Sequence, residues 1–250
     1  MSDMDTFQIG SGFTFAGTNI ADLEAAEYTL VTIALDETGS ISGYESQITD
    51  MLKAAIDACK RSPFSENLLI RVIRFGSQYR RGSSDGVDEL HGFKPLVAID
   101  LADYPILRAG GMTPLNDAVY SGVGAMNVYA KELVDLDFAV NGITFVITDG
   151  GENASVATAQ MVQDELQRSV TGEIMESHYS VLIGIGTGSG DADGVLQAFQ
   201  ADTGMDQFIW AGDANAGNLA KLAQFVSQSI SSTSQALGTG GPSRQISATI

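Results

Sequence analysis

Side chains that carry oxygen ligands gather at three places in the sequence. Residues 36–40 offer a carboxylate and two hydroxyls at every second position, and this spacing points Asp36, Thr38 and Ser40 to one side of an extended backbone. Thr113 adds a hydroxyl within a glycine-rich segment, and Asp149 adds a second carboxylate. Such hard oxygen ligands, without histidine or thiolate, suit magnesium first, then manganese or calcium, and argue against zinc or copper. The sequence therefore predicts one divalent-metal site.

The elements that must position these side chains follow from the apolar pattern. Five runs have the length of strands, and four of them are continuous and apolar, as expected for strands covered on both faces: 28–35, 68–75, 143–148, 179–185 and 207–210. Helical spacing fills the segments between and after them: 44–60, 114–134, 156–169, 194–201 and 216–231. This alternation predicts an α/β fold, a doubly wound and mostly parallel sheet flanked by helices.

The strand ends explain why the ligands should meet. In an open parallel sheet, ligands bind beyond the carboxyl ends of the strands; run 28–35 ends just before Asp36, and run 143–148 ends just before Asp149. Thr113 is a natural N-cap for the helix at 114–134, with Pro114 at its first position. A purely structural role is the alternative for each residue, because Asp36 and Asp149 could cap the following helices and Thr113 could serve only as a cap.

Three segments fall outside the alternation. Residues 78–99 contain a turn, and their flanks are expected to form strand pieces, including one antiparallel strand at a sheet edge. Residues 1–27 are expected to form an N-terminal arm that can add a short strand. The domain itself is predicted to span 28–231, and the Ser/Gly-rich residues 232–250 are predicted to form a loosely ordered tail.

Composition excludes several classes of function. The net charge of −18 repels phosphate backbones and anionic membranes, so we expect neither nucleic acid nor a membrane as partner. The single cysteine, Cys59, excludes an internal disulfide and a zinc site built from cysteines. Residues 1–10 lack a basic stretch followed by an apolar one, and no apolar run reaches the length of a membrane span. A cytoplasmic protein is the expectation.

Together the three segments resemble the metal-ion-dependent adhesion site (MIDAS) of von Willebrand factor type A (vWA) domains. The matching motifs are Asp36-Glu37-Thr38-Gly39-Ser40, Gly111-Met112-Thr113-Pro114-Leu115 and Thr148-Asp149-Gly150. The resemblance implies that Thr38, Ser40 and Thr113 ligate the metal directly, and that Asp36 and Asp149 do so directly or through water. It also implies that a partner protein supplies an Asp or Glu to the sixth position. Thr38 departs from the usual serine, and the Gly-Met-Thr-Pro-Leu form is similar to bacterial intracellular, tellurite-resistance-type proteins.

Three functions are compatible with these residues and motifs. A metal-dependent protein-interaction module is the leading hypothesis, and a structural subunit of a larger bacterial or phage assembly is the first alternative. A magnesium-dependent phosphoryl-transfer or hydrolytic enzyme is disfavoured, because Arg108 is the only basic residue placed near the site and no general base is evident. The glycine-rich residues 184–190 lack the lysine of a P-loop, so we interpret them as a loop on the rim of the site.

Overall fold

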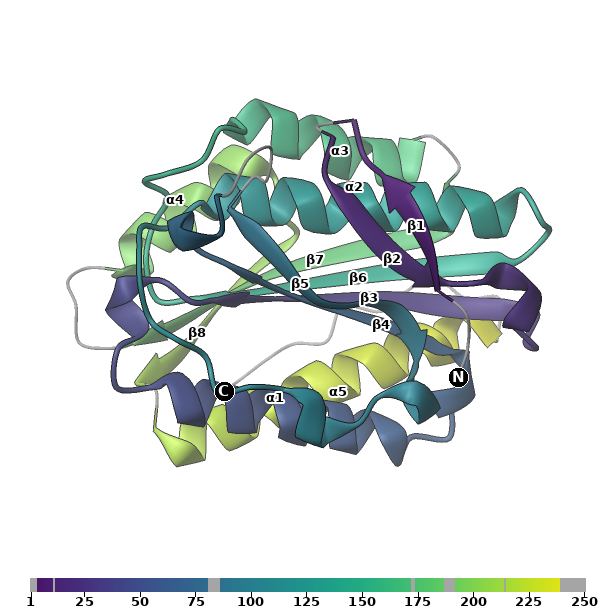
Figure 1. Ribbon diagram of the computed structural model, residues 1–250, viewed down its shortest axis with the longest axis horizontal. Coiled ribbons are helices and arrows are strands. Elements are labelled where there is room, and N and C mark those ends of the chain that lie inside the picture. Colours follow the sequence, from purple (N-terminus) through teal and green to yellow (C-terminus); the bar gives the residue numbers. More distant parts are fainter. Residues whose placement is uncertain are drawn as a thin grey trace.

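The computed structural model describes residues 4–10, 12–80, 86–171, 174–186, 192–213 and 215–238. Eight strands form one central sheet between two layers of helices (Figure 1): β1 (Met4–Gln8), β2 (Thr14–Thr18), β3 (Glu27–Asp36), β4 (Leu68–Phe75), β5 (Val87–Pro95), β6 (Ala139–Thr148), β7 (Ser177–Gly186) and β8 (Gln207–Asp213). The α-helices are α1 (Glu45–Lys60), α2 (Leu115–Val134), α3 (Ala159–Thr171), α4 (Ala192–Thr203) and α5 (Ala216–Gly238). The predicted α/β class is confirmed.

The order of the strands places the predicted ligand loops next to each other. The sheet runs β1-β2-β5-β4-β3-β6-β7-β8. Strand β3 pairs in parallel with both β4 and β6, and β7 and β8 continue the parallel pairing on the side of β6. The loops after β3 and β6 therefore leave the same edge of the sheet from adjacent strands.

Helices on both faces explain why the central strands lack polar alternation. Along β3, Leu30 and Ala34 pack with α2 on one face, while Ile33 and Leu35 pack with α1 and α5 on the other. Figure 1 shows α1 and α5 on one side of the sheet, with α2, α3 and α4 on the opposite side. A strand that is buried on both faces gains from apolar residues at every position.

The expected antiparallel strand, β5, lies inside the sheet, and the edge strand β1 forms a second antiparallel pair with β2. Strand β5 runs antiparallel to β4, as expected, but the N-terminal hairpin of β1 and β2 extends the sheet beyond it through the pair Gly17–Phe93. Aromatic packing accounts for this: the Tyr129 ring stacks on the Phe93 ring at 5.2 Å between centroids, and the Tyr129 hydroxyl donates to the Thr18 carbonyl at 2.7 Å. The arm thus provides two strands, where the sequence suggested one.

The C-terminal helix is longer than predicted. Helix α5 continues to Gly238, beyond residue 231, so the first part of the predicted tail is helical. The remainder, 239–250, lies outside the described residues, as do residues 187–190 of the glycine-rich loop. In the part of the chain that the structure describes, no helix has the length and apolarity needed to cross a membrane.

Candidate metal centre

The first two ligand loops meet where β3 and β6 end. Asp36 is the last residue of β3 and Thr148 the last of β6. The Thr148 hydroxyl donates to Asp36 Oδ2 at 2.5 Å, and the Thr38 backbone N–H donates to Asp36 Oδ1 at 2.7 Å. Both carboxylate oxygens of Asp36 are therefore hydrogen-bonded, one to the end of β6 and the other to the loop after β3.

A short chain of oxygen contacts links the next three residues. After Thr38, Ser40 lies in the single helical turn Gly39–Ile41. The two hydroxyl oxygens lie 3.2 Å apart, and the Ser40 hydroxyl donates to Asp149 Oδ1 at 2.6 Å. The structure thus brings both predicted carboxylates and both hydroxyls of the first loop together.

The third loop completes the group. The Gly39 N–H donates to the Gly111 carbonyl at 3.2 Å, which holds the segment before Thr113 against the first loop. A Cβ atom added to Gly150 would lie 3.7 Å from Ser40 Oγ and 3.9 Å from Thr113 Oγ1. The hydroxyls of Thr113 and Ser40 therefore border one space, which the missing side chain of Gly150 leaves open.

The expected N-cap role of Thr113 is wrong. Helix α2 begins one residue later than predicted, with Pro114 at the N-cap position. The N–H groups of its first turn are capped from the loop after β6 instead: Asn116 N–H donates to Glu152 Oε2 at 2.7 Å, and Asp117 N–H donates to Ser155 Oγ at 3.0 Å. The Thr113 hydroxyl is therefore not used for capping.

The two predicted aspartates do not cap the following helices either. Asp36 accepts from Thr38 and lies nine residues before the first residue of α1, whose N-cap position is held by Tyr44. Asp149 accepts from Ser40, while α3 begins only at Ala159. The geometry therefore does not support helix capping as the role of Asp36, Asp149 and Thr113.

Burial makes the site costly for negative charge. Asp36 and Asp149 are each 1% exposed. Burial raises the pKa of Asp36 from 3.8 to about 7, against the opposing effect of hydrogen bonds from Thr148 and Thr38, and the Asp149 charge raises it further. Among the described residues, no Lys, Arg or His forms an ion pair with Asp36. A cation would offset this cost.

The donor set fits a hard divalent cation. Within the described ranges, no three His, Cys, Asp or Glu side chains gather closely enough to hold a metal ion by themselves. A site here must therefore combine the two carboxylates with hydroxyl oxygens, the kind of ligand set that suits magnesium, manganese or calcium. The geometry agrees with the predicted ligands, and their binding of a metal stays a prediction.

Two acidic residues fasten the loop after β6 to α2. Glu152 accepts hydrogen bonds from the N–H groups of Asn116, Ala154 and Ser155. Asp117 accepts from the N–H groups at 156 and 157 and pairs with Arg80 at 2.8 Å. The sequence analysis did not single out Asp117, whose only signal is an acid inside an apolar helical pattern.

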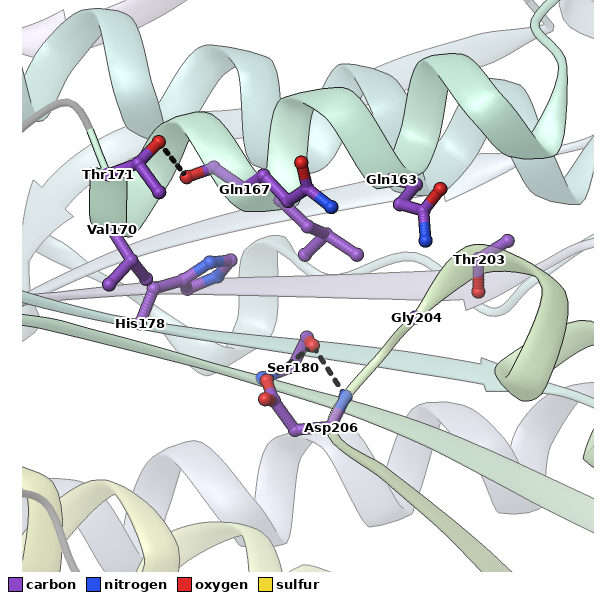
Figure 2. A pocket seen from close by; sticks show the side chains of 10 residues that line it. Gln163, Gln167, Val170, Thr171, His178, Ser180, Thr203, Gly204 and Asp206 are labelled. Atoms are coloured by element: carbon purple, nitrogen blue, oxygen red, sulfur yellow. Dashed lines mark hydrogen bonds between the residues drawn. The ribbon is translucent and has the colours of Figure 1, made fainter.

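A cavity lies away from the ligand loops (Figure 2). This cavity of about 270 Å³ is bordered by α3, by the first half of β7 and by the turn into β8, at the opposite end of the sheet strands. Its polar groups bond to the framework: Asp206 Oδ2 accepts from the Ser180 N–H and hydroxyl at 2.7 Å, and His178 Nε2 lies 3.0 Å from Thr144 Oγ1. The other histidine, His91, contacts the Tyr104 hydroxyl at 2.6 Å. Both histidines therefore form hydrogen bonds within the fold, away from the ligand loops.

Solved structures share this fold at low sequence identity. The SpaC pilus adhesin of Lactobacillus rhamnosus GG matches at 12% identity over 88% of this chain and 31% of its own (TM-score 0.61). A von Willebrand factor type A protein from Catenulispora acidiphila matches at 14% over 92% and 50% (TM-score 0.51). Proximal thread matrix protein 1 of the mussel byssus, with a zinc-occupied MIDAS motif, matches at 16% over 83% and 47% (TM-score 0.50).

These matches establish the fold of a vWA domain. The chain spans only about a third to a half of the length of these proteins. Comparison of the sequence with family models and with curated proteins gave no match. The similarity to tellurite-resistance-type proteins, suggested by the sequence, receives no support from these structures.

Proposed function

We propose that this chain is a metal-dependent protein-interaction module, in which a divalent cation accepts an acidic side chain of a partner protein. The proposal rests on one observation. The hydroxyls of Ser40 and Thr113 border one space beside Gly150, and Ser40 contacts the side chains of Thr38 and Asp149. The mussel protein, whose MIDAS motif is occupied by zinc, and the SpaC pilus adhesin have the same fold, which supports this function.

Each predicted ligand has a defined part in the proposal. The hydroxyls of Thr38, Ser40 and Thr113 bind the cation directly, and Asp36 and Asp149 bind it directly or through water. Magnesium is the proposed ion, with manganese or calcium as alternatives, and the mussel structure adds zinc to the ions worth testing. When bound, the cation supplies an electrophilic coordination position that a carboxylate can occupy.

The surroundings suit a partner with apolar residues beside its acid. Met112, next to Thr113, is 54% exposed, and Val195, at the first turn of α4, is 50% exposed. A Cβ added to Gly151 would lie 2.3 Å from Val195, so this side chain covers the loop that carries Asp149. The proposed partner segment therefore presents an Asp or Glu flanked by apolar side chains.

We propose binding and not catalysis for this site. Loop residues 36–41, 108–114 and 149–158 include no histidine or lysine, and Arg108 is the single basic side chain among them. A structural subunit with an incidental metal site is the alternative, and a cytoplasmic location remains part of the proposal. Light scattering would distinguish an assembling subunit from a monomer.

Calorimetric titration with Mg²⁺ and Mn²⁺ tests the proposal first, on the wild type, Asp149→Asn and the control Asp50→Asn, an exposed acid on α1. We expect one ion per chain for the wild type and the control, and none for Asp149→Asn. Partner capture with Mg²⁺, and its release by EDTA, then tests the interaction. Absence of metal binding by the wild type, or capture that EDTA leaves unchanged, would contradict the proposal.

A further inference from the structure

Glu37 is a buried acid between two proposed metal ligands, Asp36 and Thr38. Its side chain is fully buried, and a buried charge is tolerated only when it is paired and hydrogen-bonded. The carboxylate accepts from the Tyr79 hydroxyl and from the Arg108 backbone N–H, and it lies 3.3 Å from the Arg74 guanidinium. Each of these groups fixes the carboxylate from a different segment of the chain.

The partners of Glu37 are themselves held in place. Arg74, on β4, also pairs with Asp88 of β5 at 2.8 Å, and its guanidinium lies 5.0 Å from the centre of the Tyr79 ring. Tyr79 ends the short helical turn Ser77–Tyr79. The Glu37 carboxylate is therefore anchored to the sheet through Arg74 and to this turn through Tyr79.

The backbone of Glu37 reaches the third ligand loop. Its carbonyl accepts from the Gly110 N–H at 3.1 Å and from Gln78 Nε2 at 2.8 Å, and its own N–H donates to the Phe75 carbonyl at 3.0 Å. The bond from Arg108 N–H to the carboxylate adds another link to the same segment. Glu37 thus ties the loop of Asp36, Thr38 and Ser40 to the segment that leads into Thr113.

We propose that Glu37 is a positioning residue for the metal centre, whose buried carboxylate holds the first and third ligand loops in register. The inference rests on the proposed function, because it concerns the same site. Groups that orient metal ligands typically change metal affinity by about 10–100-fold when they are removed. Glu37 would act in this way without contacting the ion.

The test measures the Mn²⁺ dissociation constant of folded variants, together with their melting temperatures. Glu37→Gln removes the charge and is expected to weaken Mn²⁺ binding by about 10-fold or more. Tyr79→Phe removes one hydrogen bond to Glu37 without removing any ionised acid, and it is expected to weaken binding by a smaller factor. The controls are Asp50→Asn, for lost charge, and Tyr179→Phe, which loses a hydroxyl bond to Gln207 elsewhere.

Each outcome bears on one hypothesis. A weaker Mn²⁺ affinity in Tyr79→Phe, with both controls like the wild type, supports positioning by Glu37. A lowered melting temperature with an unchanged dissociation constant in Tyr79→Phe would show a merely structural role and overturn the inference. Tyr79→Phe decides alone if Glu37→Gln does not fold. Lack of Mn²⁺ binding by the wild type would instead refute the proposed function, and the inference with it.

Discussion

Replacing Asp36 with Asn should stabilise the metal-free protein at pH 8 while abolishing metal binding. Burial raises the pKa of Asp36 above its ordinary value, so the folded state binds this proton more tightly than the unfolded state does. Its contribution to stability is therefore fully present below pH 4 and is lost as the pH rises through 7. Asn avoids this loss because its side chain carries no charge.

The structure sets the size of the effect. A rise in pKa from 3.8 to about 7, at about 1.4 kcal/mol for each pH unit, corresponds to about 4 kcal/mol. The side-chain oxygen of the new Asn can still accept from the Thr38 N–H. The Thr148 hydroxyl can then donate to the Gly150 carbonyl, at 3.0 Å, and accept a hydrogen bond from the new Asn amide. We therefore expect a gain of a few kcal/mol at pH 8 and little difference at pH 4.

Urea denaturation with EDTA at pH 4, 6 and 8 measures this difference, with Asp50→Asn as the control. Added Mg²⁺ should restore stability to the wild type at pH 8, by about 2.7 kcal/mol at 100 times its dissociation constant, and should leave Asp36→Asn unchanged. If Asp36→Asn is no more stable than the wild type at pH 8, burial of the Asp36 charge is not costly; if Asp36→Asn keeps the same stabilisation by Mg²⁺, Asp36 is not a ligand.

Three further substitutions test the role of the Thr113 hydroxyl, the backbone conformation of Gly111 and the burial of His178. Thr113→Val should change the free energy of unfolding of the metal-free protein by less than about 0.5 kcal/mol, because the Thr113 hydroxyl caps no helix. It should also abolish stabilisation by Mg²⁺. A loss of about 1 kcal/mol or more without metal would indicate that the hydroxyl caps α2. Gly111→Ala should cost about 1–3 kcal/mol in urea, because φ is +72° and the new Cβ would lie 2.5 Å from Gln78 Oε1; a neutral result would contradict it. Burial lowers the pKa of His178 to about 4. The contribution of neutral His178 to stability should therefore be fully present above pH 6.5 and be lost as the pH falls towards 4. His178→Gln should make this decline shallower in acid-denaturation curves, and an equally steep decline would contradict the lowered pKa of His178.

Apolar runs and strand-end chemistry made much of this molecule predictable. Central strands such as β3 and β4 are buried on both faces, so their sequence pattern identifies them without knowledge of their neighbours. Asp36 ends β3 and Asp149 directly follows β6, so the ends of these strands locate both carboxylates. Thr113 could be assigned to the same edge because its segment leads into the next helix.

Features that depend on contacts distant in sequence were not predictable. The hairpin lies beside β5 because Tyr129, more than a hundred residues away, bonds to Thr18 and stacks on Phe93. Thr113 was expected to cap α2, but Glu152, which is 39 positions later in the chain, accepts a hydrogen bond from the first turn of this helix instead. Burial of Glu37 depends on its distant partners, and nothing in its immediate sequence distinguishes it from an exposed acid.

Anomalous diffraction from crystals grown with Mn²⁺ would show directly whether the three loops bind one metal ion. One anomalous peak is expected in the space beside Gly150, at metal–oxygen distances of about 2.0–2.6 Å from Ser40 Oγ and Thr113 Oγ1. One coordination position of this ion is expected to face solvent or an acidic side chain of another protein. A peak elsewhere, or none in the presence of saturating Mn²⁺, would contradict the proposed metal site.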